Sequence, residues 1–162
     1  MIELKPIIDS LVEHEVRFVV IGGVAIIYHG SSHVTQDLDF CYSRDDVNLE
    51  RIVKALSPFR PRLRGAPEGL PFLFDSETLK RGSNFTFETA VGDVDLLGEV
   101  SGVGDYSMVE KNSVEVTMFG LPVKVLTIES LISAKRAAGR TKDLLVLPEL
   151  EALLELKNEG EI

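Results

Sequence analysis

The sequence contains a single cysteine, Cys41, among its 162 residues. One cysteine excludes an intrachain disulfide and a metal cluster built on cysteines. The chain also lacks any apolar run near the roughly 18 residues that a membrane-spanning helix needs. Its first residues do not combine a basic segment with an apolar one, as a secretory signal does. These absences lead us to expect a cytoplasmic protein with no membrane partner, and to expect Cys41 to be a small buried residue.

Basic residues are outnumbered, because 17 Lys and Arg stand against 26 Asp and Glu, which gives a net charge of −9. Phosphate contacts supply most of the affinity for long nucleic acid, and they require a basic surface. The composition therefore disfavours binding of duplex nucleic acid. Two local basic clusters remain. The first contains Arg60, Arg62 and Arg64, and we interpret it as part of a solvated loop, with phosphate binding as the alternative. The second lies within residues 135–142.

The length suits one domain, and a hydrophobic content of 44% is sufficient for an ordinary core. Apolar residues recur with both strand and helix periodicity. The predicted strands are residues 17–21, 37–42, 83–89, 93–97, 114–118 and 123–126. The predicted helices are residues 3–15, 24–29, 49–56, 128–138, 142–147 and 149–157. Pro148 should separate the last two helices. Residues 58–72 predict a loop, because they are rich in proline, and residues 102–112 fit no single element.

This mixture predicts an α+β fold, α/β-like in its alternation of elements, with a mixed twisted sheet flanked by helices. We expect residues 1–126 to form the core. Residues 127–162 should form a C-terminal helical appendage that packs on the core within one structural domain.

Asp37 and Asp39 flank Leu38 on a predicted strand. Alternate side chains of a strand point to the same face, so the two carboxylates should project together while Leu38 and Phe40 face the core. Two carboxylates this close repel each other unless a cation lies between them. Mg²⁺ binds carboxylate oxygens together with waters and phosphates. The pair therefore predicts a site for a divalent metal ion.

Two glycines, Gly22 and Gly23, follow the first predicted strand and precede a helix. Such a turn presents backbone amides to a phosphate group, and glycine lets the backbone approach a ligand closely. A third acid follows on a later predicted strand, where Asp93 and Asp95 point to the same side. We favour Asp95, because two apolar leucines follow it and would anchor it in the sheet, and Asp93 is the alternative.

Taken in order, these residues resemble the polymerase-beta-type nucleotidyltransferase superfamily. Its pattern is a hydrophobic residue with two small residues, a spacer, an Asp-hydrophobic-Asp-hydrophobic block and a third acid on a later strand. Here the pattern reads Ile21-Gly22-Gly23, thirteen residues, Asp37-Leu38-Asp39-Phe40 and, later, Val94-Asp95-Leu96. A second block, residues 135–143, is similar to one in the branch that includes AbiE-type abortive-infection toxins. Together the blocks span most of the chain.

The resemblance implies the nucleotidyltransferase fold and an enzyme that moves a nucleoside monophosphate from a triphosphate to a hydroxyl group. The implied catalytic residues are Asp37 and Asp39, which would hold two ions of Mg²⁺ or Mn²⁺, and Asp95, which would contact one ion and help to deprotonate the acceptor. The implied nucleotide-binding residues are Gly22, Gly23, Lys135, Arg140 and Lys142.

The resemblance leaves the acceptor open among a small molecule, a protein side chain and an RNA end. A toxin of this branch would have an antitoxin protein as its partner. The chain is short for an enzyme that must also recognise a large acceptor, so a homodimer that completes the cleft is a further expectation.

His33 departs from the pattern, because many relatives of this branch carry arginine two residues before the threonine that here is Thr35. A neutral histidine does not supply the permanent charge of arginine. The residues therefore leave an alternative open, a catalytically weak or inactive member of the fold that binds nucleotide or a partner protein. An unrelated metal-dependent phosphohydrolase is a third interpretation.

Overall fold

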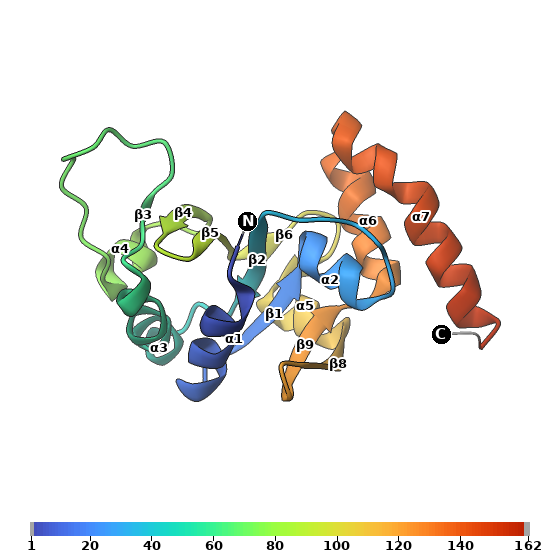
Figure 1. Ribbon diagram of the computed structural model, residues 1–162, viewed down its shortest axis with the longest axis horizontal. Helices are drawn as coiled ribbons and strands as arrows, with labels where there is room; N and C mark the ends of the chain where they lie inside the picture. Colours follow the sequence, from blue (N-terminus) through green and yellow to red (C-terminus); the bar gives the residue numbers. More distant parts are fainter. Residues whose placement is uncertain (1, 161–162) are drawn as a thin grey trace.

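The computed structural model describes residues 2–160 and has an α+β architecture. A mixed sheet in the order β3-β4-β5-β2-β1-β9-β8 runs through it, and helices flank the sheet (Figure 1). The strands of this sheet are β1 (Phe18–Ile21), β2 (Asp37–Tyr42), β3 (Arg62–Leu63), β4 (Phe85–Thr89), β5 (Gly92–Leu97), β8 (Ser113–Met118) and β9 (Leu121–Leu126). A separate ribbon consists of β6 (Glu99–Val100) and β7 (Gly104–Asp105). The helices are α1 (Leu4–Glu13), α2 (Gly22–Tyr28), α3 (Asp46–Leu56), α4 (Ser76–Arg81), α5 (Tyr106–Lys111), α6 (Ile128–Ala138) and α7 (Thr141–Asn158), with a 3₁₀ turn at Ser57–Phe59.

The centre of the sheet is β2, which lies antiparallel to β1 on one side and parallel to β5 on the other. Along β2 the apolar Leu38 and Phe40 are fully buried, while Asp37 and Asp39 are partly exposed. This alternation is the one that strand periodicity predicts. The structure confirms the mixed twisted sheet flanked by helices.

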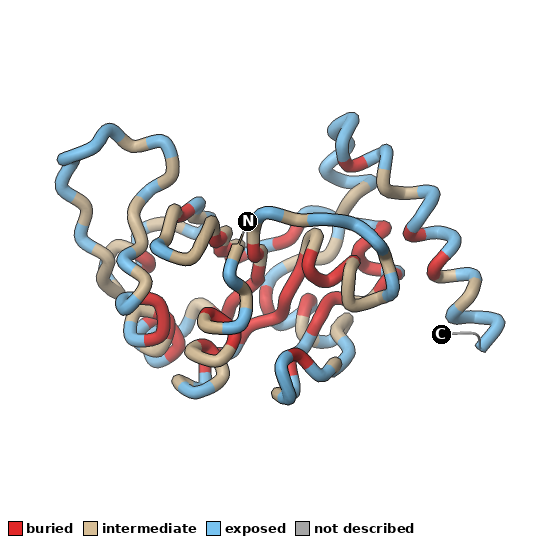
Figure 2. Tube along the Cα trace, in the orientation of Figure 1, coloured by how far each residue is buried: buried red, intermediate tan, exposed pale blue. Residues whose placement is uncertain are grey.

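Buried residues concentrate along the central strands and on the inward faces of the helices around them (Figure 2). Helix α1 shows why: Ile7, Ile8 and Leu11 recur at helical spacing, and all three are fully buried in the core. Within the sheet, the Phe18 and Phe40 rings meet edge to face with their centroids 5.6 Å apart. Cys41 is buried, as expected for a small hydrophobic residue. No helix within residues 2–160 is both long and apolar enough to cross a membrane.

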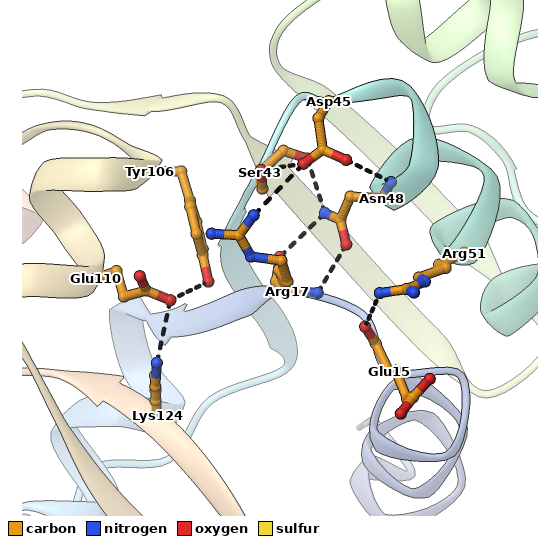
Figure 3. A network of polar contacts seen from close by, with 9 residues as sticks. All are labelled: Glu15, Arg17, Ser43, Asp45, Asn48, Arg51, Tyr106, Glu110 and Lys124. Atoms are coloured by element: carbon orange, nitrogen blue, oxygen red, sulfur yellow. Dashed lines mark hydrogen bonds and ion pairs between the residues drawn. The ribbon is translucent and has the colours of Figure 1, made fainter.

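A polar network ties the start of β1 to the end of β2 and to α3 (Figure 3). At its centre, Asn48 is only 1% exposed. Its side-chain oxygen accepts a hydrogen bond from the Arg17 backbone N–H at 2.7 Å, and its amide nitrogen donates to the carbonyls of Arg17 at 3.1 Å and Ser43 at 2.7 Å. Asn48 therefore bonds three backbone groups at this corner, of which the Arg17 carbonyl also accepts a hydrogen bond from the Ser43 N–H at 3.2 Å.

Replacing Asn48 with alanine is expected to lower the free energy of unfolding by about 2–4 kcal/mol, because it leaves buried backbone groups without partners. Urea denaturation measures this directly. Asn158→Ala, at the exposed end of α7, is the matched control and should change stability by less than about 0.5 kcal/mol. Equal stability of the two variants would contradict the role given to Asn48.

Two predictions about local structure are corrected, and one segment without a prediction is assigned. Pro148 does not end a helix, because α7 continues from Thr141 to Asn158. Proline removes one backbone donor, but Pro148 is exposed, so water can hydrate the freed carbonyl, and the buried Leu150 and Leu153 anchor the second half. The proline-rich loop contains the short strand β3, paired with β4. The ambiguous residues 102–112 contain β7 and α5.

Candidate functional site

The register of two parallel strands brings three carboxylates together. Asp39 of β2 lies directly beside Asp95 of β5, and Asp37 lies beside Asp93. One carboxylate oxygen from each of Asp37, Asp39 and Asp95 lies within 4.8 Å of the others. Asp93 is not part of this group. Of the two candidates for the third acid, the structure therefore places Asp95 in the cluster with Asp37 and Asp39.

The two glycines predicted to bind phosphate lie against this cluster. Gly22 has φ +67°, a conformation that glycine adopts readily. A Cβ atom at Gly22 would collide with the Asp39 carboxylate, and one at Gly23 would lie 2.8 Å from the Thr35 side chain. Both positions therefore require glycine, because their neighbours fill the space that a side chain would occupy.

Gly22→Ala is expected to be destabilising by about 2 kcal/mol or more, since it combines backbone strain with a collision against the Asp39 carboxylate. Gly120→Ala is the matched control, because Gly120 has φ +79° and a Cβ atom added there would have no neighbour within 4 Å. The control therefore measures the strain alone, at about 1 kcal/mol. Thermal denaturation of both variants tests this, and equal losses would show that Asp39 does not crowd Gly22.

Two carboxyl groups of the cluster have pKa values above the usual value for aspartate. Burial, followed by the charge and hydrogen bond of Asp95 and the charge of Asp37, raises the pKa of Asp39 to about 7, although Lys135 opposes the shift. Burial and the charge of Asp95 also raise the pKa of Asp37 above its usual value. Burial and the neighbouring carboxylates thus both disfavour the ionised forms of Asp37 and Asp39, and a cation bound between them would favour those forms.

The three cationic residues predicted to bind nucleotide, Lys135, Arg140 and Lys142, lie where α6 and α7 meet. Asp143, whose side chain is 1% exposed, forms ion pairs with Lys135 at 3.4 Å and with Arg140 at 2.6 Å. Burial acts to raise the pKa of Asp143, but the Arg140 hydrogen bond and the Lys135 charge outweigh it and hold that pKa below its usual value. Lys135 and Arg140 are therefore fixed in place by a buried anion. Sequence reasoning included Asp143 in the second block but gave it no role.

A cleft of about 560 Å³ joins these groups. Its polar lining includes the glycine pair, the three-carboxylate cluster, His33, Lys135, Arg140 and Lys142. Its apolar lining includes Ile26, Leu97, Leu126, Leu131 and Val146. The structure thus brings every residue of the predicted site to one cleft. A cleft lined by both charged and apolar groups suits a ligand with both phosphate and ring systems.

Sequence reasoning missed Arg64. Its guanidinium donates a hydrogen bond to Asp95 at 2.6 Å and lies 3.3 Å from the Asp93 carboxylate. The side chain is 30% exposed, so Arg64 does not belong to a fully solvated loop. The alternation of arginines at residues 60–64 was visible in the sequence, but a proline-rich segment carries no periodicity that could place one of them beside Asp95.

No protein-family model matches the chain, and no curated protein matches it. Solved structures do. The chain resembles the lincosamide antibiotic adenylyltransferase LnuA with lincomycin bound, at a TM-score of 0.61 and 13% identity, over 94% of this chain and 98% of that one. It also resembles the antibiotic-resistance factor ANT(2'')-Ia in solution, at a TM-score of 0.54 and 15% identity, over 97% and 90% of the two chains.

A further structure of ANT(2'')-Ia, in complex with adenylyl-2''-tobramycin, matches at a TM-score of 0.51 and 12% identity, over 92% of this chain and 95% of that one. At these identities the similarity concerns the backbone, and it extends over nearly the full length of each protein. The chain therefore has the mixed α+β fold of nucleotidyltransferases, with its three-carboxylate cluster in a cleft of that fold.

Proposed function

We propose that the protein is a metal-dependent nucleotidyltransferase, which transfers a nucleoside monophosphate from a nucleoside triphosphate to a hydroxyl group, with pyrophosphate as the leaving group. The observation that carries this proposal is the cluster of Asp37, Asp39 and Asp95, which two adjacent strands present to a cleft that also holds a glycine pair and three cationic side chains.

The donor set fits Mg²⁺ or Mn²⁺. These hard cations bind carboxylate oxygens and keep positions for water and phosphate, and the three oxygens of the cluster lie close enough to share one ion. The raised pKa of Asp39 points the same way, because a divalent ion would offset both causes of the shift, burial first and then the charges of Asp95 and Asp37. When bound, such ions neutralise phosphate charge and stabilise the entering and leaving oxygens of the displacement.

The chain's own groups would position the substrates. The backbone amides at Gly22 and Gly23 would bind the phosphates, with Lys135 and Lys142 as cationic partners. Arg140 is engaged with Asp143, so its part is to shape the wall of the cleft. Asp95 would accept the proton of the acceptor hydroxyl as its oxygen bonds to the α-phosphorus and the bond to pyrophosphate breaks.

We further propose a small molecule as the acceptor. The structures of LnuA and ANT(2'')-Ia hold the small molecules lincomycin and adenylyl-2''-tobramycin. The net charge of −9 also disfavours a long polyanionic acceptor such as RNA.

Transfer of an α-phosphate label tests the proposal. The protein is incubated with Mg²⁺ or Mn²⁺, each α-labelled triphosphate and pooled small-molecule, protein and RNA fractions. The expected result is a metal-dependent labelled product in the small-molecule fraction, absent with Asp37→Asn. Label in the protein or RNA fraction would support the proposed nucleotidyl transfer but contradict the proposal of a small-molecule acceptor. Release of free nucleoside monophosphate or phosphate alone would instead indicate a phosphohydrolase.

A nucleotide-binding protein without turnover is a second candidate, favoured by two observations. Arg64 occupies one oxygen of Asp95, and the cleft carries His33 at the position where the family branch that the sequence resembles often has arginine. This candidate predicts nucleotide binding that survives Asp37→Ala and Asp39→Ala unchanged, together with no labelled product. Isothermal titration with a non-hydrolysable triphosphate distinguishes it from the enzyme.

A further inference from the structure

Arg64 reaches the carboxylate cluster from a strand that is not adjacent to it. The residue follows β3, and its backbone N–H donates to the Thr86 carbonyl of β4 at 3.0 Å. Thr86 in turn pairs with Asp95 of β5. Because β4 lies between Arg64 and Asp95, the arginine side chain must extend across β4 to reach Asp95.

The guanidinium is held at several points. One terminal nitrogen donates to Asp95 Oδ1 at 2.6 Å and to the Phe87 carbonyl at 3.2 Å. The Nε atom is buried without a hydrogen-bond partner among the described residues, although it lies 3.3 Å from Asp93 Oδ2. A surface ion pair made by a mobile arginine would not show these backbone and carboxylate contacts together. Arg64 is therefore a fixed cation beside the cluster.

The charges and free oxygens indicate what this cation does. Asp37, Asp39 and Asp95 contribute three negative charges when ionised, and the single charge of Arg64 is shared between Asp95 and Asp93. The cluster therefore keeps at least two negative charges, which is enough to attract one divalent ion. The Oδ1 atom of Asp95 is bonded to Arg64, so only Oδ2 is free of the arginine. A carboxylate that bridges two ions uses both of its oxygens, and Asp95 has one to offer while Arg64 holds the other.

We propose that Arg64 is a positioning residue which, by holding Asp95 Oδ1, limits the protein without nucleotide to one divalent ion. A second ion binds only when Arg64 releases Asp95, and the triphosphate supplies both phosphate oxygens for that ion and a new anionic partner for the guanidinium. This inference rests on the proposed metal-dependent function and adds to it the order in which ions and nucleotide bind.

Counting bound Mn²⁺ tests the inference without using activity. Electron paramagnetic resonance of free Mn²⁺ is followed at pH 7.5, without nucleotide, for the unmodified protein, Arg64→Gln and Arg62→Gln. Arg62→Gln is the matched control, because Arg62 lies two residues earlier and donates to the Ala66 carbonyl. The unmodified protein and the control should bind one ion. Arg64→Gln should bind two, with the first bound about tenfold more tightly, since a positive charge near the site is gone.

Three further variants separate the charge of Arg64 from its contact with Asp95 and from misfolding. Arg64→Lys retains the charge and should bind one ion, whereas Arg64→Met retains the aliphatic stem and replaces Arg64→Gln if that variant does not fold. The double variant Arg64→Gln with Asp95→Asn should return to one ion, because the second ion depends on Asp95.

The outcomes separate this inference from the proposed function. If Arg64→Gln binds one ion with unchanged affinity, the role of Arg64 is contradicted but the metal site is not. Two ions bound to the unmodified protein would have the same consequence. Absence of Mn²⁺ binding by every variant would overturn both the metal-dependent function and the inference.

Discussion

Asp39→Asn is expected to abolish nucleotidyl transfer while it stabilises the metal-free protein. The asparagine keeps the shape of the side chain but removes the charge that holds a divalent ion beside Asp37 and Asp95. Loss of a metal ligand in such a site should lower kcat/KM by about a thousandfold or more. Steady-state transfer of labelled nucleotide measures this loss, and Mn²⁺ titration should show that ion binding is lost with it.

The gain in stability follows from the direction of the pKa shift. Asp39 has a pKa of about 7 in the folded protein and an ordinary, lower pKa when unfolded, so the folded state binds the extra proton. Ionisation therefore opposes folding: the cost is absent below about pH 4, increases as the pH rises through the interval between the two pKa values, and is complete above about pH 7.

Asp39→Asn removes this cost, so its free energy of unfolding should exceed that of the unmodified protein by on the order of 1–3 kcal/mol at pH 8 and by little near pH 4. Urea denaturation at both pH values, without divalent ions, tests the sign. Asp9→Asn, on the exposed surface of α1, should show no such pH dependence. A variant less stable than the unmodified protein at pH 8 would contradict the electrostatic account of the cluster.

Asp143→Asn is expected to weaken both the fold and nucleotide binding. Asp143 is almost fully buried, accepts hydrogen bonds from the backbone and side chain of Arg140, and pairs with Lys135. Asparagine would leave two cations without their anion. Because both cations are partly exposed, the loss should be about 1–3 kcal/mol, which is below that of a fully buried pair.

Affinity for a non-hydrolysable triphosphate should fall about tenfold in the same variant, because Lys135 is no longer held toward the cleft. Titration calorimetry measures this fall. Glu151→Gln is the control: it removes the anion of the exposed Arg136–Glu151 pair on the same two helices, and should cost less than about 1 kcal/mol. Unchanged nucleotide affinity in Asp143→Asn would show that the α6–α7 corner is only structural.

The part of the site that lies on regular strands was accessible from sequence. Period-2 alternation predicts that Asp37 and Asp39 share a face, and the structure confirms this for β2. The preference for Asp95 over Asp93 rested on a weaker signal, namely apolar residues after it. In the structure the strand register places Asp95 beside Asp39, whereas Asp93 lies beside Asp37 and outside the three-carboxylate cluster.

Features that depend on tertiary contacts were not accessible. Arg64 reaches the site across β4 from an irregular segment, and no local pattern reports such a path. Pro148 lies within a helix because its neighbours Leu150 and Leu153 are buried against the rest of the protein, so packing overrides the local preference of the backbone. The pairing of Asp143 with Lys135 likewise depends on how α6 and α7 meet.

The most direct test of the account is to locate the ion. Crystals grown with Mn²⁺ and a non-hydrolysable nucleoside triphosphate would show the metal by its anomalous scattering. The account predicts a Mn²⁺ peak among the carboxylates of Asp37, Asp39 and Asp95, with the triphosphate running past Gly22. A peak elsewhere, or a nucleotide bound in the cleft with no metal at these three residues, would contradict it.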